Sequence, residues 1–499
     1  MRADVRHYSV ALTGQVDSEL RAHLLREDGQ EDICLATYVI SSGFSRTSMI
    51  VRSVILPEAG EREVHGNATF SGDYVIRAAT LAAQRSEGIV VLHSHPGGYG
   101  WQHMSSADDD AERSFAYLAH EITGLPLVGM TLAGRDYTWS ARIWSKAGSA
   151  SWAESVRVID TCLRVAWNAV LRPVPSITAA QVRTISGWGE GMQADIARLR
   201  VLVVGVGSVG LDVAQRLVAS GIQQVGVMDF DTVETVNLDR LIGATRKDAS
   251  RGRSKVQVAA RLMRAAATAA SPQIVIHEVS ICLSEGLAIA LDYDIIFSCV
   301  DRPWPRAVLN TLAYADLIPV IDGGIAIDPF LDGGMRCASW RSHVIMPGQP
   351  CLVCNGQIRP TEIALDRNGR LDDPAYIAGA GSDLKARLKR QNVALLSSSV
   401  SASLLAQFVT LVVAPGGAGV EGPLQYHLVG HSLEHLPKSL NASCYFEQRS
   451  SSGDGRIKMT GPHPKAQESI ATRSRLRRTF RSRFCELNSR LAMAAHCWR

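Results

Sequence analysis

The sequence predicts an α/β protein built of two unlike parts, a mixed α/β domain and a doubly wound parallel sheet. In the first part, short apolar runs such as Ile33 to Ile40 alternate with helical stretches such as Tyr74 to Arg85. This alternation is typical of helices packed on a central sheet. In the second part, from Arg200 to about Pro415, a strand, a glycine-rich turn, a helix and another strand follow in order. That order is typical of parallel strands joined by crossover helices.

Changes in composition along the chain predict five segments. Pro173 and Pro175 interrupt a stretch that otherwise favours helix and place a boundary near residue 174. An arginine-rich run from Ala471 to Phe484 predicts a solvated tail or a terminal helix. The expected segments are a mixed α/β domain at 1–145, a helical connector at 146–197, a doubly wound domain at 198–415, a strand and turn extension at 416–465 and a basic tail at 466–499.

The composition is that of an ordinary globular protein, with 499 residues, 46% hydrophobic and 20% charged, and a formal net charge of +4. So small a charge argues against nucleic acid as a partner. We see no apolar run long enough to span a bilayer and no apolar signal core after Met1, so we expect a cytoplasmic protein without membrane contact. The ten cysteines are expected to be reduced.

Two histidines end a buried strand in the first part. His93 and His95 are two residues apart, so in a strand they point to the same face. Pro96 ends the strand, and a helix then begins near Ser105, which brings Asp108 of its first turn back toward the strand end. Two imidazoles and one carboxylate leave a fourth zinc position open for water, as in catalytic zinc sites. The spacing therefore predicts a zinc-dependent hydrolase.

The stretch HSHPGGYGWQHMSSADDD resembles the signature of the JAB/MPN (JAMM) metalloproteases, and most of all that of bacterial JAB domains fused to adenylating domains. The resemblance implies three zinc ligands, His93, His95 and Asp108. Asp109 and Asp110 are rivals to Asp108, because the loop is longer than in the eukaryotic enzymes. Ser105 would orient the attacking water or the tetrahedral intermediate.

The general base of this family is a glutamate ahead of the histidines. Glu31 leads into the strand that begins at Ile33, and its distance ahead of His93 fits the family. Glu27 and Asp32 are the alternatives. A carboxylate in this place can take a proton from water and pass it to the leaving amine.

A glycine turn follows the first strand of the second part. The buried run from Val201 leads into Gly205, Gly207 and Gly210 and then into a helix. Such a turn lets the backbone approach a phosphate, and the helix N-terminus offers free amides. Asp229 ends the next strand, where a carboxylate can bind a ribose hydroxyl. Alone, this pattern also fits a nicotinamide or flavin dehydrogenase.

Charged residues after the second and third strands favour an enzyme that cleaves ATP over a dehydrogenase. Arg240 and Lys255 can neutralise triphosphate oxygens, and Asp301 can hold Mg²⁺. The full set at the carboxyl ends of the strands is Asp229, Asp231, Asn237, Arg240, Lys255 and Asp301.

These motifs, from Arg183 to Cys354, resemble the ThiF-like adenylating superfamily, which includes ubiquitin-activating enzymes and activators of sulfur carriers. The resemblance implies a Rossmann-like homodimer that uses ATP and Mg²⁺. It assigns the ribose to Asp229 beside Asp231, the phosphates to Asn237, Arg240 and Lys255, Mg²⁺ to Asp301, and a phosphate across the dimer to Arg183. Leu241 stands where the family often has glutamine.

Cys351 and Cys354 stand where that family places the first half of a structural zinc site. One pair supplies two ligands, fewer than such a site needs, and Cys444 comes singly. The polar loop from Gly356 to Gln391 contains no cysteine for a thioester, which leaves Cys351, Cys354 and Cys444 as the candidates. One interpretation is that the chain stops at the acyl-adenylate and passes it to a partner's cysteine.

Together the two sites predict a bifunctional enzyme. The first part would cut a peptide or isopeptide bond after a ubiquitin-like protein, and the second would adenylate the exposed carboxylate. The expected partners are that ubiquitin-like protein and a separate conjugating enzyme. The main alternative is maturation and activation of a sulfur carrier for cofactor synthesis or sulfur transfer. A non-catalytic scaffold and a nicotinamide dehydrogenase are the remaining alternatives.

Overall fold

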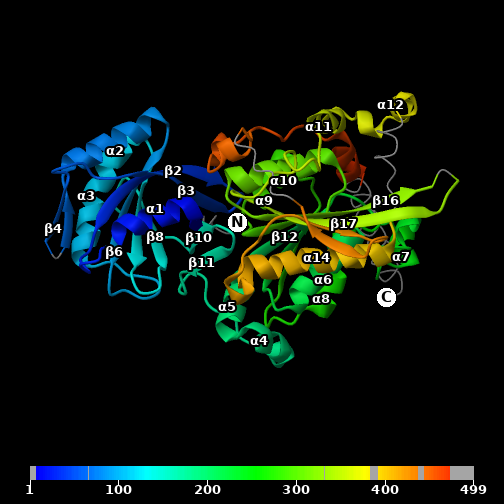
Figure 1. Ribbon diagram of the computed structural model, residues 1–499, viewed down its shortest axis with the longest axis horizontal. Coiled ribbons are helices and arrows are strands. Elements are labelled where there is room, and N and C mark those ends of the chain that lie inside the picture. The colour runs from blue at the N-terminus through cyan, green and yellow to red at the C-terminus, as the bar shows by residue number, and fades with distance from the viewer. Residues whose placement is uncertain (1–6, 66, 331, 382–391, 437–442, 473–499) are drawn as a thin grey trace, which may run out of the picture.

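The computed structural model describes residues 7–65, 67–330, 332–381, 392–436 and 443–472, which form two large sheets with helices on their faces (Figure 1). The first sheet has nine strands and the second has eight. The α/β class expected from the sequence is confirmed. Residues 464–472 are helical, and the rest of the expected basic tail lies outside the described residues.

The first sheet is mixed, in the order β11-β10-β1-β3-β2-β6-β7-β8-β9. β1 pairs in parallel with β10 and β3, β6 pairs in parallel with β7, and the other neighbours are antiparallel. The strands are β1 (His7–Thr13), β2 (Ile33–Ser42), β3 (Arg46–Ile55), β6 (Gly88–His95), β7 (Leu127–Ala133), β8 (Trp139–Trp144), β9 (Ala150–Trp152), β10 (Ser155–Ile159) and β11 (Leu163–Trp167), with a separate hairpin of β4 (Arg62–His65) and β5 (Asn67–Phe70).

Three helices cover the two faces of the first sheet. In β6, Ile89 and Val91 join one core cluster and Val90 and Leu92 join another, because successive side chains of a strand alternate between faces. α1 (Gly14–Leu24) packs on one face, and α2 (Gly72–Gln84) and α3 (Ser106–Thr123) pack on the other. The end of β6 and the start of α3, which carry the histidine motif, are therefore held by rigid elements.

The helical connector expected at 146–197 is wrong over its first half. β9, β10 and β11 lie there and complete the first sheet. β10 is buried along its whole length between β1 and β11, and a pairing so distant in sequence leaves no local periodic signal. Helices follow only later, as a 3-10 turn at Ala179–Gln181, α4 (Val182–Trp188) and α5 (Glu190–Arg198).

The second sheet has the order β14-β13-β12-β15-β16-β17-β18-β19. Its first five strands are parallel, and the last three are antiparallel to their neighbours. The chain runs outward from β12 in both directions, so a crevice is expected where β12 and β15 diverge. The strands are β12 (Arg200–Val204), β13 (Gln224–Met228), β14 (Gln273–His277), β15 (Ile295–Ser298), β16 (Val320–Pro329), β17 (Met335–Ile345), β18 (Leu424–His427) and β19 (Ser432–His435).

Helices lie on both faces of this sheet, as the doubly wound arrangement requires (Figure 1). One face carries α6 (Ser208–Ala219), α8 (Lys255–Ala266) and α14 (Ala394–Val413). The other carries α9 (Ser284–Ala290), α10 (Pro303–Ala315) and α11 (Pro360–Arg367). Two further short helices are α7 (Arg246–Ser250) and α12 (Pro374–Gly379).

α14 corrects one expectation, because by length and composition it is apolar enough to cross a membrane. Its mean hydropathy over the tested window is 1.7, and 44% of that window is buried. Leu404, Phe408 and Leu411 pack into the core below the second sheet. The apolar composition is that of a helix packed against a sheet.

The two sheets share a core and a set of buried ion pairs. Ala11 and Ile50 of the first sheet belong to the same apolar cluster as Val201 of the second. The buried guanidinium of Arg46 pairs with Asp294 and donates to backbone oxygens of residues 291 and 293. Arg157 lies 4.0 Å from the same carboxylate, and Glu154 pairs with Arg200.

The C-terminal segment adds a second connection between the sheets. Ser41 at the end of β2 donates to the buried carboxylate of Asp316 at 2.7 Å, and Arg456 donates to the same carboxylate at 2.6 and 2.8 Å. Gly453 approaches β2 so closely that a Cβ there would lie 2.3 Å from the carbonyl oxygen of Ile40. Residues far apart in the sequence thus form one buried polar cluster.

Candidate functional sites

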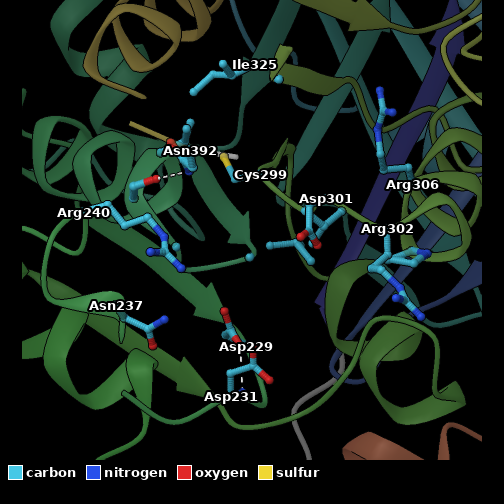
Figure 2. A pocket seen from close by; sticks show the side chains of 18 of the residues that line it. Asp229, Asp231, Asn237, Arg240, Cys299, Asp301, Arg302, Arg306, Ile325 and Asn392 are labelled. Carbon is cyan, nitrogen blue, oxygen red and sulfur yellow. Dashed lines mark hydrogen bonds between the residues drawn. The ribbon is translucent and has the colours of Figure 1, made fainter. Parts of the chain in front are cut away.

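A cavity of about 1490 Å³ opens at the carboxyl ends of the parallel strands of the second sheet (Figure 2). It lies where the strand order switches, as expected for this fold. Of the residues predicted for ATP and Mg²⁺, the cavity is lined by Gly205, Gly207, Asp229, Asp231, Asn237, Arg240, Lys255 and Asp301.

The backbone geometry of the turn requires glycine at two of its three glycine positions. Gly205 has a φ of +87°, and a Cβ there would lie 2.6 Å from the carbonyl oxygen of Cys299. A Cβ on Gly210 would lie 1.9 Å from the carbonyl oxygen of Gly205, so Gly210 serves the close packing of α6 and does not line the cavity. Apart from its chain neighbours, no atom of the described residues lies within 4 Å of the Cβ position of Gly207, which leaves backbone amides at the start of α6 accessible to an anion.

Asp229 is held by backbone amides at the end of β13. Its carboxylate accepts hydrogen bonds from the amides of Val206 and Asp231, each at 2.8 Å. Burial raises the pKa of Asp229, and the nearby Lys255 opposes that rise. Both carboxylate oxygens keep free lone pairs, so a ribose hydroxyl can still donate to them.

Lys255 connects the acidic residues of the cavity. Its Nζ lies 2.8 Å from Oδ2 of Asp231. Burial alone would lower the pKa of Lys255, but the carboxylates of Asp229, Asp231 and Asp301 outweigh burial and raise it. The ammonium is therefore charged at neutral pH and available to phosphate oxygens.

Arg240 and Asp301 lie on opposite sides of the cavity, with Asp229 and Asp231 below them in this view (Figure 2). Arg240 donates to the carbonyl oxygen of Val236 at 2.7 Å and keeps other N–H groups for a ligand. The side-chain oxygen of Asn237 accepts from the amide of Glu234 at 3.0 Å, so this residue also shapes its own turn. Leu241 is buried and lines the cavity.

Arg183 lies on α4 and is exposed, outside the residues that line the cavity of its own chain. Its predicted contact across a dimer stays a prediction.

The sequence reasoning missed several cavity residues. Arg306, on the first turns of α10, forms an ion pair with Asp322, whose carboxylate also accepts from Ser298. Asn392 donates to Oγ of Ser208 at 2.9 Å, next to the glycine turn. Arg306 could have been predicted, because it is one of the basic residues that follow Asp301 closely in the sequence. Asn392 comes from a distant loop that carries no local motif. The missed residues with charged or amide side chains include Arg302, Arg306, Arg336, Arg341, Asn392 and Lys465.

In the first sheet, the histidine motif forms a compact cluster. Nε2 of His93 and Nε2 of His95 are 3.2 Å apart, and they lie 3.8 and 3.7 Å from Oδ2 of Asp108. Burial lowers the pKa of His93 to about 3, so its ring is neutral and can act as a ligand. The hydrogen bond to Asp108 raises the pKa of His95. Three donors within 4.8 Å of one another fit the donor set of a catalytic zinc site.

The structure distinguishes Asp108 from Asp109 and Asp110, the alternative candidates for the third ligand. Asp109 and Asp110 both pair with Arg113 on the outer side of α3. Ser105 donates to Oδ2 of Asp108 from its hydroxyl at 2.8 Å and from its amide at 3.0 Å. In this arrangement Ser105 orients the carboxylate and caps α3.

Glu31 also lies beside this cluster, directly before β2. Burial raises the pKa of Glu31, while His95 lowers it and Asp108 raises it, so all three groups share one electrostatic environment. The alternative Asp32 is buried in ion pairs with Arg26 and Arg62. Glu27 is exposed. Of the three candidates, only Glu31 combines partial burial with proximity to the ligands.

Gln102 orients one of the histidines. Its side-chain NH₂ donates to the carbonyl oxygens of Tyr99 and Gly100 at 3.0 and 2.9 Å, which turns its oxygen toward Nδ1 of His95 at 3.2 Å. Nδ1 of His95 must then carry the proton. In the neutral ring the lone pair is then on Nε2, which faces His93 and Asp108, whereas the hydrogen bond to Asp108 belongs to the protonated ring, in which Nε2 also carries a proton.

Cys351, Cys354 and Cys444 form a second candidate metal cluster, with sulfur atoms within 4.8 Å of one another. The sequence had left Cys444 unplaced. Sγ of Cys444 lies 3.6 Å from Sγ of Cys351. Burial raises the pKa of Cys351 and of Cys354, which does not favour a reactive thiolate in the absence of a metal.

Fold and cavity define the second part as a doubly wound α/β domain with a phosphate-binding type of glycine turn. Residues 178–415 match the family model described as the ThiF family, and this part of the chain is a ThiF domain. The resemblance inferred from the sequence is confirmed for this domain.

The chain is 32% identical over 157 residues to molybdopterin-synthase adenylyltransferase of Escherichia coli (strain K12), which covers 31% of this chain and 57% of that protein. It is 28% identical to adenylyltransferase and sulfurtransferase MOCS3 of Caenorhabditis briggsae, over 34% of this chain and 42% of that protein. It is also 28% identical to the NEDD8-activating enzyme E1 catalytic subunit of Dictyostelium discoideum, over 35% of this chain and 38% of that protein. The chain thus spans only part of each relative's length.

Among solved structures, E. coli MccB with ATP is similar at 16% identity and a TM-score of 0.41, covering 54% of this chain and 74% of that chain.

Proposed function

We propose that the ThiF domain uses ATP to adenylate the C-terminal carboxylate of a small sulfur-carrier or ubiquitin-like protein. One observation carries this proposal: a single cavity at the switch point joins the glycine turn to Asp229, Lys255 and Asp301. A hydride-transfer enzyme has no need of so many charged groups there, whereas the triphosphate of ATP does.

The chemistry is a transfer of AMP. A carboxylate oxygen of the partner attacks the α-phosphorus of ATP, the bond to the β-phosphate oxygen breaks, and pyrophosphate leaves with that electron pair. The product is a mixed anhydride of the partner's carboxylate with AMP. Asp229 would hold the ribose, and Arg240 and Lys255 would offset charge on the phosphates. Asp301 would hold Mg²⁺, which supplies further neutralisation of phosphate charge when bound.

The names of the relatives support a sulfur carrier, ahead of a lysine-conjugated modifier, as the proposed partner. Two of them are a molybdopterin-synthase adenylyltransferase and an adenylyltransferase and sulfurtransferase, and one is a NEDD8-activating subunit. This reverses the order expected from the sequence. Mass spectrometry of the partner after reaction with a sulfur donor distinguishes the two outcomes, because a thiocarboxylate and a lysine-linked conjugate differ in mass.

The direct test is ATP–pyrophosphate exchange by the full chain with a small protein that ends in an exposed, glycine-rich tail. Exchange that depends on this tail would support the proposal. Binding of the tail protein without exchange would favour the scaffold alternative, and binding of NAD in place of ATP would favour the dehydrogenase.

A second candidate function concerns the first sheet, and it rests on the cluster of His93, His95 and Asp108 beside Glu31. We propose a zinc-dependent peptidase that cuts after the same small protein, either to mature it or to release it. The two histidines and Asp108 would hold the metal, which supplies Lewis-acid activation of water when bound. Glu31 would take the proton of that water and pass it to the leaving amine.

Glu31→Gln is expected to lower the rate of cleavage of a linear fusion of the partner by about 100-fold or more, because a proton-transfer group contributes roughly 10² to 10⁴ in rate. The measurement is single-turnover cleavage followed by gel electrophoresis. Glu27→Gln, on an exposed residue nearby, is the matched control and should cleave at the wild-type rate. Unchanged cleavage in Glu31→Gln would assign the base to another residue.

Gln102→Ala is expected to weaken zinc binding at the histidine cluster by about 10- to 100-fold, the usual effect of losing the partner that orients a ligating histidine. Competition with a chromogenic chelator measures the affinity, and His93→Ala gives the baseline contributed by other sites. Gln84→Ala, on an exposed glutamine of α2, should bind zinc as the wild type does. Equal affinities for Gln102→Ala and Gln84→Ala would contradict the orienting role.

The three-cysteine cluster is proposed as a structural zinc site. Three thiolates are one short of the usual four ligands. Glu447 lies close enough to influence Cys354 electrostatically, and its carboxylate would complete the set.

A further inference from the structure

A segment beyond the ThiF domain closes one end of the cavity. Residues 459–472 follow the strand and turn extension and return to the cavity wall, where His463 and Lys465 line it. Several hydrogen bonds hold the segment: Nε1 of Trp304 donates to the carbonyl oxygen of Met459 at 2.8 Å, the amide of Gly461 to that of Cys282 at 2.9 Å, and Oγ of Ser469 to that of Phe230 at 2.9 Å. The guanidinium of Arg367 also donates to the carbonyl oxygen of Thr460 at 3.5 Å. The segment is therefore fixed to the ends of β13 and β14 and to the start of α10.

His463 is clamped between two aromatic rings. Its ring centroid lies 5.1 Å from that of Phe230 and 5.1 Å from that of Trp304, at interplanar angles of 84° and 81°. These edge-to-face contacts fix the plane of the imidazole. Nδ1 of His463 is buried and has no hydrogen-bond partner among the described residues. Burial also lowers the pKa of His463, so near pH 7 the ring is neutral, with one N–H and one lone pair.

The place of His463 matches the end of the cavity where a base would lie. Phosphates belong at the glycine turn after β12, and the ribose belongs at Asp229 after β13. β14 is the next strand outward, so a nucleotide laid along this path puts its base beyond β13, toward β14. The residues after β14 that line this end of the cavity are Val279, Ser280, Ile281 and Cys282.

We infer that His463 contacts the base of the bound nucleotide and that residues 459–472 make the cavity selective for ATP. The inference rests on the proposed function. An unpaired polar nitrogen is costly, and because the His463 side chain lines the cavity, a purine edge there can form a hydrogen bond with the imidazole. Adenine and guanine present opposite donor and acceptor patterns at positions 1 and 6, so an imidazole that keeps one tautomer pairs with one of them and not with the other.

Titration calorimetry of the full chain with Mg·ATP and with Mg·GTP tests this inference. His463→Phe keeps an aromatic ring between Phe230 and Trp304 but removes both nitrogens. It is expected to weaken ATP binding by about tenfold, the effect of roughly one hydrogen bond at a buried site, and to leave GTP binding nearly unchanged. Gln467→Ala, an exposed residue of the same segment, is the matched control and should bind both nucleotides as the wild type does.

The outcomes separate this inference from the proposed function. Wild-type protein that binds no ATP would overturn both. Wild-type binding of ATP together with an unchanged ratio of ATP to GTP affinity in His463→Phe would overturn the inference alone, as would an equal loss for both nucleotides. If His463→Phe lowers the melting temperature, Ser469→Ala, which removes only the anchor to Phe230, must show the same selective loss of ATP for the inference to stand.

Discussion

Asp301→Ala is expected to lower ATP–pyrophosphate exchange by about 100-fold or more, because removing one group that stabilises transferring charge typically costs 10² to 10³ in rate. Asp301 lines the cavity opposite Arg240 and contributes to the electrostatic environment of Lys255. If Asp301 holds Mg²⁺, the half-saturating Mg²⁺ concentration should rise as well. Exchange assays over a range of Mg²⁺ concentrations measure both effects.

Asp301 is a better test of this cavity than Lys255. Lys255 forms an ion pair with Asp231 and offsets the charge of Asp229, so its loss would disturb the folded state as well as the chemistry. Glu285→Ala, on an exposed acidic residue of α9, removes a carboxylate outside the cavity and should exchange at the wild-type rate. An Asp301→Ala variant with wild-type exchange would refute the proposed magnesium ligand.

Asp294→Asn is expected to lower the free energy of unfolding by about 3 to 5 kcal/mol, the usual cost of leaving a buried charge without its partner. The buried guanidinium of Arg46 would lose its only carboxylate among the described residues, and Arg157 would lose a neighbour at 4.0 Å. Urea unfolding measures the change. Asp328→Asn removes one partner of an exposed ion pair with Arg336 and should cost at most about 1 kcal/mol. A similar small loss in both variants would contradict the role of Asp294.

The same carboxylate predicts a loss of stability in acid. Burial alone would raise the pKa of Asp294, but Arg46, Arg157 and Arg200 lower it to about 2. A group whose pKa is lower in the folded state than its unfolded value of about 3.9 stabilises the fold above that value. This stabilisation should disappear as the pH falls from about 4 to 2. In unfolding experiments across that range, Asp294→Asn should show a weaker pH dependence than the wild type.

The sequence predicted the parts of the fold whose signals are local. The run from Val201 through the glycine turn identified β12 and α6, and the two histidines identified the end of β6, because strand alternation and turn geometry act over a few residues. β10 was missed because its burial depends on pairing with β1, some 145 positions earlier. α14 was missed as a long apolar helix because serines interrupt its apolar residues, and its burial comes from packing on the sheet.

The site residues with local sequence signals were likewise predicted, and those that come from distant segments were missed. Asp229 and Asp301 were predicted because each follows a strand end closely in the sequence, and the carboxyl ends of parallel strands meet. Lys255, which begins α8, was predicted from the family motif. Cys444 could not be assigned, since it joins Cys351 across 93 positions. Asn392 and His463 reach the cavity from distant segments, and only the folded chain brings them there.

The cluster of Ser41, Asp316 and Arg456 has a consequence for how the protein is made. Synthesis on the ribosome delivers β2 first, α10 much later and Arg456 last of all. Until residue 456 leaves the exit tunnel, the carboxylate of Asp316 lacks its cationic partner, and burying it against β2 would be unfavourable. The nascent chain should therefore keep this face open until residue 456 has emerged, and ribosome-bound chains arrested before residue 456 should be cleaved there by proteases that spare the released protein.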